Sequence, residues 1–286
     1  MENELYKADR ADFDELARYL RGQYEGIFDE KMIQAHLSEF VDTQNALLLA
    51  ANLVADGHVG RRMLDIGSGY GANVFCAREH GIDACGIEIA PMEVQFARRR
   101  LQRLRPADDA GEVYLLGDGQ SLPFSGAAFD VVTIMNVLEH VPDYRKLVDE
   151  ALRVLRPGGS LYILCPNYAA FRREAHYHVP WFPLLPKALA SLYLRALGRN
   201  PAFLQTSIHY CTNWGVLAHL ARAGAVIHNP QRQKLRQIDS INSAKARRML
   251  GVLAKLKLLG AVEVLLTLMF LNPLKGSINL KAVKRG

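Results

Sequence analysis

Cysteine is scarce in this sequence. The 286 residues include four cysteines, Cys76, Cys85, Cys165 and Cys211, and none of them belongs to a C-x-x-C pair. Histidines with the spacing of zinc ligands are absent as well. We therefore expect reduced, mostly buried thiols, and we predict neither a disulfide framework nor a metal site.

Long uncharged apolar runs are also missing. Residues 249–274 form the most apolar stretch, but Lys255, Lys257 and Glu263 interrupt it. Its longest uncharged part, residues 264–274, is too short to span a bilayer. The first five residues contain no apolar signal region, so we expect a cytoplasmic protein without a transmembrane helix.

Acidic residues are rare towards the end of the chain. From Gln231 onward there are twelve Lys or Arg residues and two acids, although the whole chain has a net charge of only +6. Such a basic segment can face nucleic acid, an acidic substrate or an anionic membrane, or it can simply be solvated. The segment lacks interleaved aromatic residues and contains no known nucleic-acid module, which argues against nucleic acid. Peripheral contact with the inner face of a membrane stays open.

Hydrophobic residues make up 50% of the chain and charged residues 22%, as in an ordinary globular protein. Between residues 61 and 165, short buried runs such as 130–136 alternate with helix-like segments such as 91–104 and 143–155. This alternation predicts a parallel α/β sheet with helices on both faces.

Insertions interrupt the alternation twice. We divide the chain into a helical cap (1–55), a core (56–168), an acceptor-side insertion (169–210), a core continuation (211–230), a basic and apolar insertion (231–274) and a last core strand (275–286).

The strongest local signal is a glycine-rich loop, Asp65-Ile66-Gly67-Ser68-Gly69-Tyr70-Gly71, between a predicted strand and a predicted helix. Glycines let the backbone turn tightly and let a ligand approach it closely. The helix N-terminus adds free N–H groups and a positive dipole end. Glu88 ends the next strand, where a carboxylate can accept the hydroxyls of a ribose. The combination predicts a nucleoside-bearing ligand. A dinucleotide is the second candidate, although its G-x-G-x-x-G fingerprint differs from the G-x-G-x-G found here.

At these residues the sequence resembles the class I S-adenosylmethionine-dependent methyltransferases, and in particular their ubiquinone/menaquinone-type small-molecule branch. The matching segments follow in the family's order: Asp65 to Gly71, Glu88, Asp118, Pro123-Phe124 with Phe129-Asp130, Asn136 to Val141, and Leu152 to Gly159. The resemblance implies a Rossmann-like, doubly wound, seven-stranded sheet. It further implies an antiparallel last strand at residues 277–283. The sequence pattern itself adds an N-terminal helical cap and insertions after strands five and six.

The resemblance also implies S-adenosyl-L-methionine as the cofactor. The predicted cofactor-binding residues are Asp65, Gly67, Ser68, Gly69, Gly71, Glu88, Ile89, Asp118, Gly119, Gln120 and Asn136. Asp65 could instead only cap the glycine turn.

In ubiquinone-type O-methyltransferases a similar loop carries Glu-x-x-Glu-His and can hold a divalent metal. Here Asn136 replaces the first glutamate, and an amide is a poorer ligand for a hard cation, so no metal is predicted.

Three histidines are candidates for a general base, His140, His176 and His178, because imidazole titrates near neutral pH. His176 and His178 could instead be surface residues of a lid, and the Glu139-His140 pair also recurs in members of the resembled family with unlike chemistry. Tyr168, Arg172 and Tyr177 follow strand five and are predicted to bind the substrate, with Arg172 suited to an anionic acceptor. Tyr24 and Phe28 of the helical cap are expected to close over the cofactor.

These residues predict transfer of a methyl group, to oxygen, on a small-molecule or a lipid- or glycan-type acceptor by in-line displacement. Two alternatives stay open, a non-catalytic cofactor-binding protein and an NAD-dependent oxidoreductase. The insertion at 231–274 either packs internally as a lid or contacts a membrane interface.

Overall fold

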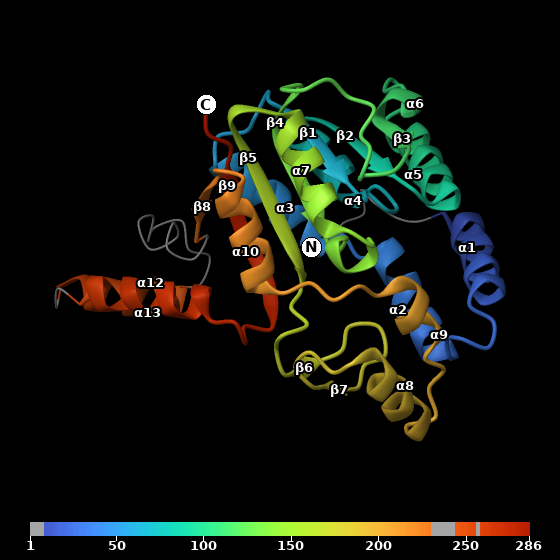
Figure 1. Ribbon diagram of the computed structural model, residues 1–286. Coiled ribbons are helices and arrows are strands. Elements are labelled where there is room, and N and C mark those ends of the chain that lie inside the picture. The colour runs from blue at the N-terminus through green and yellow to red at the C-terminus, as the bar shows by residue number, and fades with distance from the viewer. Residues whose placement is uncertain (1–8, 230–243, 256–257) are drawn as a thin grey trace.

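The computed structural model describes residues 9–229, 244–255 and 258–286. At its centre lies a seven-stranded sheet with the strand order β3-β2-β1-β4-β5-β9-β8 (Figure 1). The strands are β1 (Arg62–Ile66), β2 (Asp83–Glu88), β3 (Tyr114–Leu116), β4 (Phe129–Met135), β5 (Leu155–Pro166), β8 (Val226–His228) and β9 (Ser277–Val283). β9 runs antiparallel to β5 and to β8. The predicted Rossmann-like sheet with an antiparallel last strand is confirmed.

Helices cover both faces of this sheet. Those of the core are α3 (Gln44–Ala55), α4 (Ala72–Glu79), α5 (Pro91–Leu104), α6 (Ala110–Val113), α7 (Tyr144–Val154) and α10 (Asn213–Arg222). Side chains alternate between the faces of a strand. Met63 of β1 therefore packs in a cluster with α3, α4 and α5, whereas Leu64 and Ile66 pack in a cluster with α7 and α10. The sheet is buried on both faces, as doubly wound parallel sheets are.

The remaining elements surround the carboxyl ends of the strands or extend from the sheet edge. They are α1 (Arg10–Gln23), α2 (Glu30–Val41), the 3₁₀ turn η2 (Leu138–His140), β6 (Arg172–Arg173), β7 (Pro180–Trp181), α8 (Lys187–Ala196), α9 (Ala202–Ser207), α12 (Ala244–Lys255) and α13 (Leu259–Leu271). Among the described residues, no helix is both long enough and apolar enough to cross a membrane.

The N-terminal helices do not behave as one unit. Leu16 and Leu20 of α1 cluster with Leu37 and Phe40 of α2, whereas Ala46, Ala50 and Leu53 of α3 belong to the cluster that covers the sheet. Of these three helices, α3 covers the sheet directly, whereas α1 and α2 pack on the core helix α5 through Phe96. In the predicted insertion at 231–274, residues 231–243 and 256–257 lie outside the described residues.

The strand order locates the ligand site of such a sheet. β1 pairs with β2 on one side and with β4 on the other, because the chain first builds the sheet outward to β3 and then returns to β4. Loops that leave the carboxyl ends of β1 and β4 consequently diverge, and the crevice between them is where open α/β sheets bind ligands.

Candidate active site

A cleft of about 620 Å³ opens at this crevice. The predicted residues among its lining are Gly67, Gly69, Glu88, Ile89, Asp118, Gly119, Gln120, Asn136, His140, His176 and His178. They come from the loops after β1, β2, β3 and β4 and from the segment before β7. Tyr24 and His36 also line the cleft, from the chain between α1 and α2 and from α2. Residues far apart in the sequence thus meet in one cavity.

The glycine loop is pressed against its neighbours at two positions. A Cβ on Gly67 (φ 70°) would lie 2.3 Å from Cγ2 of Val137, and one on Gly71 (φ 83°) would lie 2.6 Å from the ring of Tyr114. The Tyr114 hydroxyl also donates to the Gly71 carbonyl at 2.9 Å. Left-handed backbone and lack of space both require glycine here. These two glycines let the loop, the glycine cradle, pack against Val137 and Tyr114, while Gly69, where a Cβ would meet only Glu93 Oε2, leaves the backbone open to the cleft.

The Glu88 carboxylate already accepts hydrogen bonds from the backbone of the loops around it. Its Oε2 accepts the Gly69 N–H at 3.0 Å, and its Oε1 accepts the N–H groups of Ile89 at 2.7 Å and Ala90 at 2.9 Å. A carboxylate offers about four lone-pair positions, so one on Oε2 is left for a ribose hydroxyl. A second ribose bond would displace one of these backbone N–H groups. In the loop after β3, which also lines the cleft, Asp118 Oδ1 accepts a hydrogen bond from the Gln120 N–H at 2.8 Å.

Three predicted cofactor residues, Asp65, Ser68 and Gly71, do not line the cleft. Asp65 is fully buried and accepts hydrogen bonds from Thr133 Oγ1 at 2.5 Å and Asn73 Nδ2 at 3.2 Å. Burial raises the pKa of its carboxyl to about 7, although both hydrogen bonds act in the opposite direction. Asp65 therefore ties β1 to β4 and to the start of α4, and so fixes the glycine loop from behind.

Two histidines of the cleft face each other. Nε2 of His140 lies 3.3 Å from Nε2 of His176. On the opposite side of each ring, Nδ1 of His140 lies 2.9 Å from the Ser207 carbonyl oxygen and Nδ1 of His176 lies 3.0 Å from Glu174 Oε1. Carbonyl and carboxylate oxygens only accept, so both Nδ1 atoms carry a proton. If both rings were neutral, two Nε2 atoms without protons would then face each other. Their separation of 3.3 Å requires one proton shared between them.

His140 is the ring of this pair whose neutral form is favoured. Burial, together with the charge of His176, lowers the pKa of His140 to about 4, which leaves the His140 ring neutral and accepting. Glu174 supplies the opposite charge beneath His176. Burial raises the pKa of Glu174, but the hydrogen bonds and positive charge around it prevail and lower the pKa to about 2. Glu174, His176 and His140 therefore form a chain that can hold a proton at the cleft wall.

The residues predicted to bind the substrate support this chain instead of lining the cleft. The Tyr168 hydroxyl donates to Glu174 Oε1 at 3.0 Å, and Arg172 Nη2 lies 3.5 Å from the same oxygen while its guanidinium stacks over the Tyr168 ring. The N–H of Tyr177 donates to Glu174 Oε2 at 2.7 Å. The structure thus places Tyr168, Arg172 and Tyr177 one layer behind the cleft wall.

Sequence reasoning overlooked two further groups of the cleft. His36 of α2 lies edge-on to the rings of Tyr24 and Phe28, and burial, then the charges of His176 and His178, lowers its pKa to about 4. Phe203 of α9 contacts the rings of His140 and His176. Phe203 is an apolar residue in a helix, which predicts burial but not a place in the cleft. Nothing in the sequence around His36 indicates that it reaches the cleft.

Glu139 is a buried carboxyl whose Oε2 has no hydrogen-bond partner among the described residues. Burial raises the pKa of this group from 4.5 to about 7. Between these pH values the native state binds more protons than the unfolded state, so Glu139 lowers the stability of the native state as the pH rises from about 4.5 to about 7.

We expect Glu139→Gln to remove this loss, because the amide does not titrate. The free energy of unfolding of the variant should exceed that of the native chain by about 3 kcal/mol at pH 8 and by less than about 1 kcal/mol at pH 5. Urea unfolding of both proteins at the two pH values measures the difference. An equal gap at pH 5 and pH 8 would contradict the raised pKa of Glu139 in the native state.

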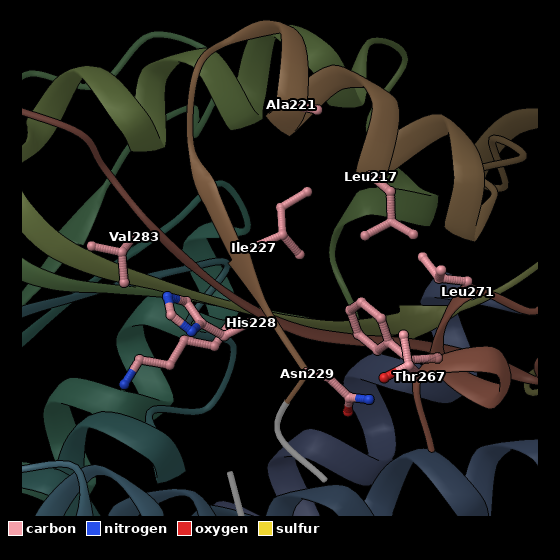
Figure 2. Close-up of a pocket in the computed structure, with 10 residues that line it drawn as sticks. Leu217, Ala221, Ile227, His228, Asn229, Thr267, Leu271 and Val283 are labelled. Atoms are coloured by element: carbon pink, nitrogen blue, oxygen red, sulfur yellow. The ribbon is translucent and has the colours of Figure 1, made fainter. Parts of the chain in front are cut away.

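A second cavity, of about 670 Å³, lies at the far edge of the sheet and includes none of the predicted site residues. Figure 2 shows its lining, with Leu217 and Ala221 from α10, Ile227 from β8, and Thr267 and Leu271 from α13. It lies away from the carboxyl ends of β1 to β4. In the described part of the chain, no group of three or more His, Cys, Asp or Glu residues could hold a metal ion.

Known proteins share this core. Residues 64–163 match a family model described as a methyltransferase domain. An uncharacterized methyltransferase of Mycobacterium sp. (strain JLS) is 39% identical over 100 residues, which cover 35% of this chain and 36% of that protein. A ubiquinone biosynthesis O-methyltransferase of Idiomarina loihiensis is 34% identical over 114 residues, which cover 39% of this chain and 45% of that protein. The chain thus matches less than half the length of these curated relatives.

A solved structure shares the fold at low sequence identity. It is phosphoethanolamine N-methyltransferase 2 of Haemonchus contortus in complex with phosphomonomethylethanolamine and S-adenosylhomocysteine. Its TM-score is 0.51 at 20% identity, over 85% of this chain and 53% of that one. At this identity the likeness concerns the architecture of the sheet and its helices.

Proposed function

We propose that this chain, whose core is a class I S-adenosylmethionine-dependent methyltransferase domain, transfers a methyl group from S-adenosyl-L-methionine to an oxygen atom of an acceptor. The observation that carries the proposal is that one cleft is lined both by the glycine cradle with Glu88 and by the His140–His176 pair. The glycine cradle and Glu88 suit a nucleoside cofactor. The His140–His176 pair suits removal of a proton from a hydroxyl group.

The cradle fits the cofactor by shape and by charge. Gly67 and Gly69 would leave room for its nucleoside, Glu88 would accept a ribose hydroxyl, and Asp118 would face the adenine amino group. Asn136, at the end of β4 with a φ of 56°, would contact the methionine part. When bound, the cofactor supplies a methyl group on an electrophilic sulfonium.

The chain's own contribution is to align the acceptor and take its proton. In the proton-free state, the two Nε2 atoms of His140 and His176 form a preformed proton acceptor beside the Glu174 charge. The acceptor hydroxyl would give its proton to this pair as its oxygen attacks the methyl carbon. His36, Tyr24 and Phe203 would exclude water from the reacting groups.

We further propose a lipid- or glycan-linked acceptor. Pro166 at the end of β5 lines the cleft, and the next residue, Asn167, holds the chain segment that follows the apolar helix α13. An acceptor with an apolar anchor would therefore meet an apolar surface close to the cleft. The alternative of a non-catalytic binding protein is less consistent with a buried, charged Glu174 maintained beneath two cleft histidines, since such burial is costly without a use.

The experiment follows the methyl group. Purified protein is incubated with methyl-labelled cofactor and cell lysate, and the label is partitioned between organic and aqueous phases. We expect label in the organic phase that survives mild alkaline treatment, as ethers do and esters do not. His176→Asn should reduce the transfer by about 10²-fold, whereas the matched variant His219→Asn, on α10 against Asp149, should keep it.

Each outcome bears on a separate part of the proposal. Alkali-labile label would indicate a carboxylate acceptor, and aqueous label would exclude the lipid anchor. Cofactor binding without any transfer of label would favour the non-catalytic alternative. Binding of NAD in place of the labelled cofactor would overturn the assignment of the cleft.

A further inference from the structure

Helices α12 and α13 contact each other and extend away from the body of the protein (Figure 1). Apart from Glu263 and Thr267, α13 consists of glycine and apolar residues. The row formed by Val262, Leu266 and Phe270 is buried or half-buried. The opposite side leaves large apolar side chains 49% to 62% exposed: Val264, Leu265, Leu268, Met269 and Leu271. A helix that is apolar on nearly all sides is normally buried in protein or in lipid.

The exposed stripe of α12 mixes apolar and basic side chains. Met249 and Val252 are 58% and 52% exposed, and Arg248 and Lys255 lie exposed on the same side of the helix. Between residues 244 and 275 the sequence contains six Lys or Arg residues and one acid. Basic and apolar side chains side by side are typical of helices that lie in the interface of anionic membranes.

The end of α13 is held firmly against the body. Asn213 Nδ2 donates to the Phe270 carbonyl at 3.0 Å, and Trp214 Nε1 donates to the Leu271 carbonyl at 2.6 Å. The Trp214 ring itself is 59% exposed. Indole rings with one polar contact are favoured at the level of lipid headgroups. Asn167, next to the cleft-lining Pro166, adds bonds from Nδ2 to the carbonyls of Pro273 and Lys275. The helix pair is thereby fixed relative to the cleft.

We infer that the α12–α13 pair docks the protein on an anionic lipid surface, with its apolar stripes in the interface and its basic residues at the headgroups. The 13 residues of α13 measure about 20 Å, less than the hydrocarbon thickness of a bilayer, so the helix lies along the surface. A second copy of this chain is a poorer occupant, because two surfaces with this positive excess repel each other. The fixed connection through Asn167 would bring the cleft to the membrane.

The test is sedimentation with vesicles in the absence of cofactor and acceptor, so that its result is independent of methyl transfer. The full chain should bind vesicles containing phosphatidylglycerol much more tightly than pure phosphatidylcholine vesicles. V264D/L268D should weaken this binding at least ~10-fold by placing charges in the interface. R248Q/K255Q should weaken it by about 25-fold, at about fivefold for each charge.

The control is L48D/V59D, which adds the same charge at apolar side chains that are 56% and 54% exposed on the body. This variant should bind vesicles nearly as the native chain does. Thermal unfolding monitors the fold of each variant, and R248Q/K255Q tests the proposal should V264D/L268D be misfolded. Equal vesicle binding by the native chain and both helix-pair variants would overturn the inference. So would a dimer in analytical ultracentrifugation that V264D/L268D dissociates, with no binding to vesicles.

Discussion

The variant Gly69→Arg is expected to bind S-adenosyl-L-methionine at least ~100-fold more weakly than the native chain, a loss of about 2.7 kcal/mol, while its unfolding temperature changes little. Gly69 differs from its neighbours in the loop because a Cβ there meets only Glu93 Oε2, at 3.3 Å. Its backbone has a φ of 51°, a conformation that costs other residues about 1 kcal/mol. The arginine side chain would therefore extend into the cleft and occupy the space of the cofactor.

Gly67→Ala is the matched comparison within the same loop. Its methyl group would overlap Val137 Cγ2 at 2.3 Å, so this change should lower the unfolding temperature as well as the affinity. Equilibrium dialysis with labelled cofactor and thermal unfolding measure the two properties separately. Unchanged cofactor binding by Gly69→Arg would refute the assignment of the whole cofactor site.

The sheet and the glycine loop were predictable because their signals are local. Parallel strands are buried on both faces, so β1 and β4 appear in the sequence as short apolar runs between polar helices. Ser277–Val283 alternates apolar and polar residues, and it forms β9 with that alternation in its burial. The loop from Asp65 to Gly71 and the carboxylate of Glu88 each lie within a few residues of a strand end, where chain order alone determines their place.

The wall of histidines was less predictable because it depends on contacts between distant segments. His140 and His176 were both candidates, but their facing nitrogens follow from the path of the chain between β5 and β7. His36 approaches the same cleft from α2, more than a hundred residues before His140, and nothing in its neighbourhood indicates this. Tyr168 and Tyr177 carry side chains typical of a substrate pocket, yet the Tyr168 hydroxyl donates to the buried Glu174 carboxylate and the Tyr177 hydroxyl donates to the Asn200 carbonyl.

Glu174→Gln is expected to reduce kcat for methyl transfer by about 10²-fold and to leave cofactor affinity unchanged. Glu174 lies behind His176 and touches no reacting atom, so it acts as a positioning residue. Its carboxylate fixes the Nδ1–H tautomer of His176 and stabilises a proton between His176 and His140. The neutral amide keeps the size of the side chain but removes the charge, and the histidine pair then accepts the proton of the acceptor less readily.

The pH profile distinguishes this role from simple packing. The native rate should rise with pH as the histidine pair loses its shared proton, because only the proton-free pair can take the proton of the acceptor. Without the Glu174 charge the pair holds that proton less tightly, so the acid limb should move to lower pH while the plateau falls. Tyr168→Phe removes one hydrogen bond to Glu174 Oε1 but keeps the charge, and its acid limb should stay in place. If both variants lose activity equally with the native pH profile, Glu174 only supports packing, and the base for the acceptor lies elsewhere in the cleft.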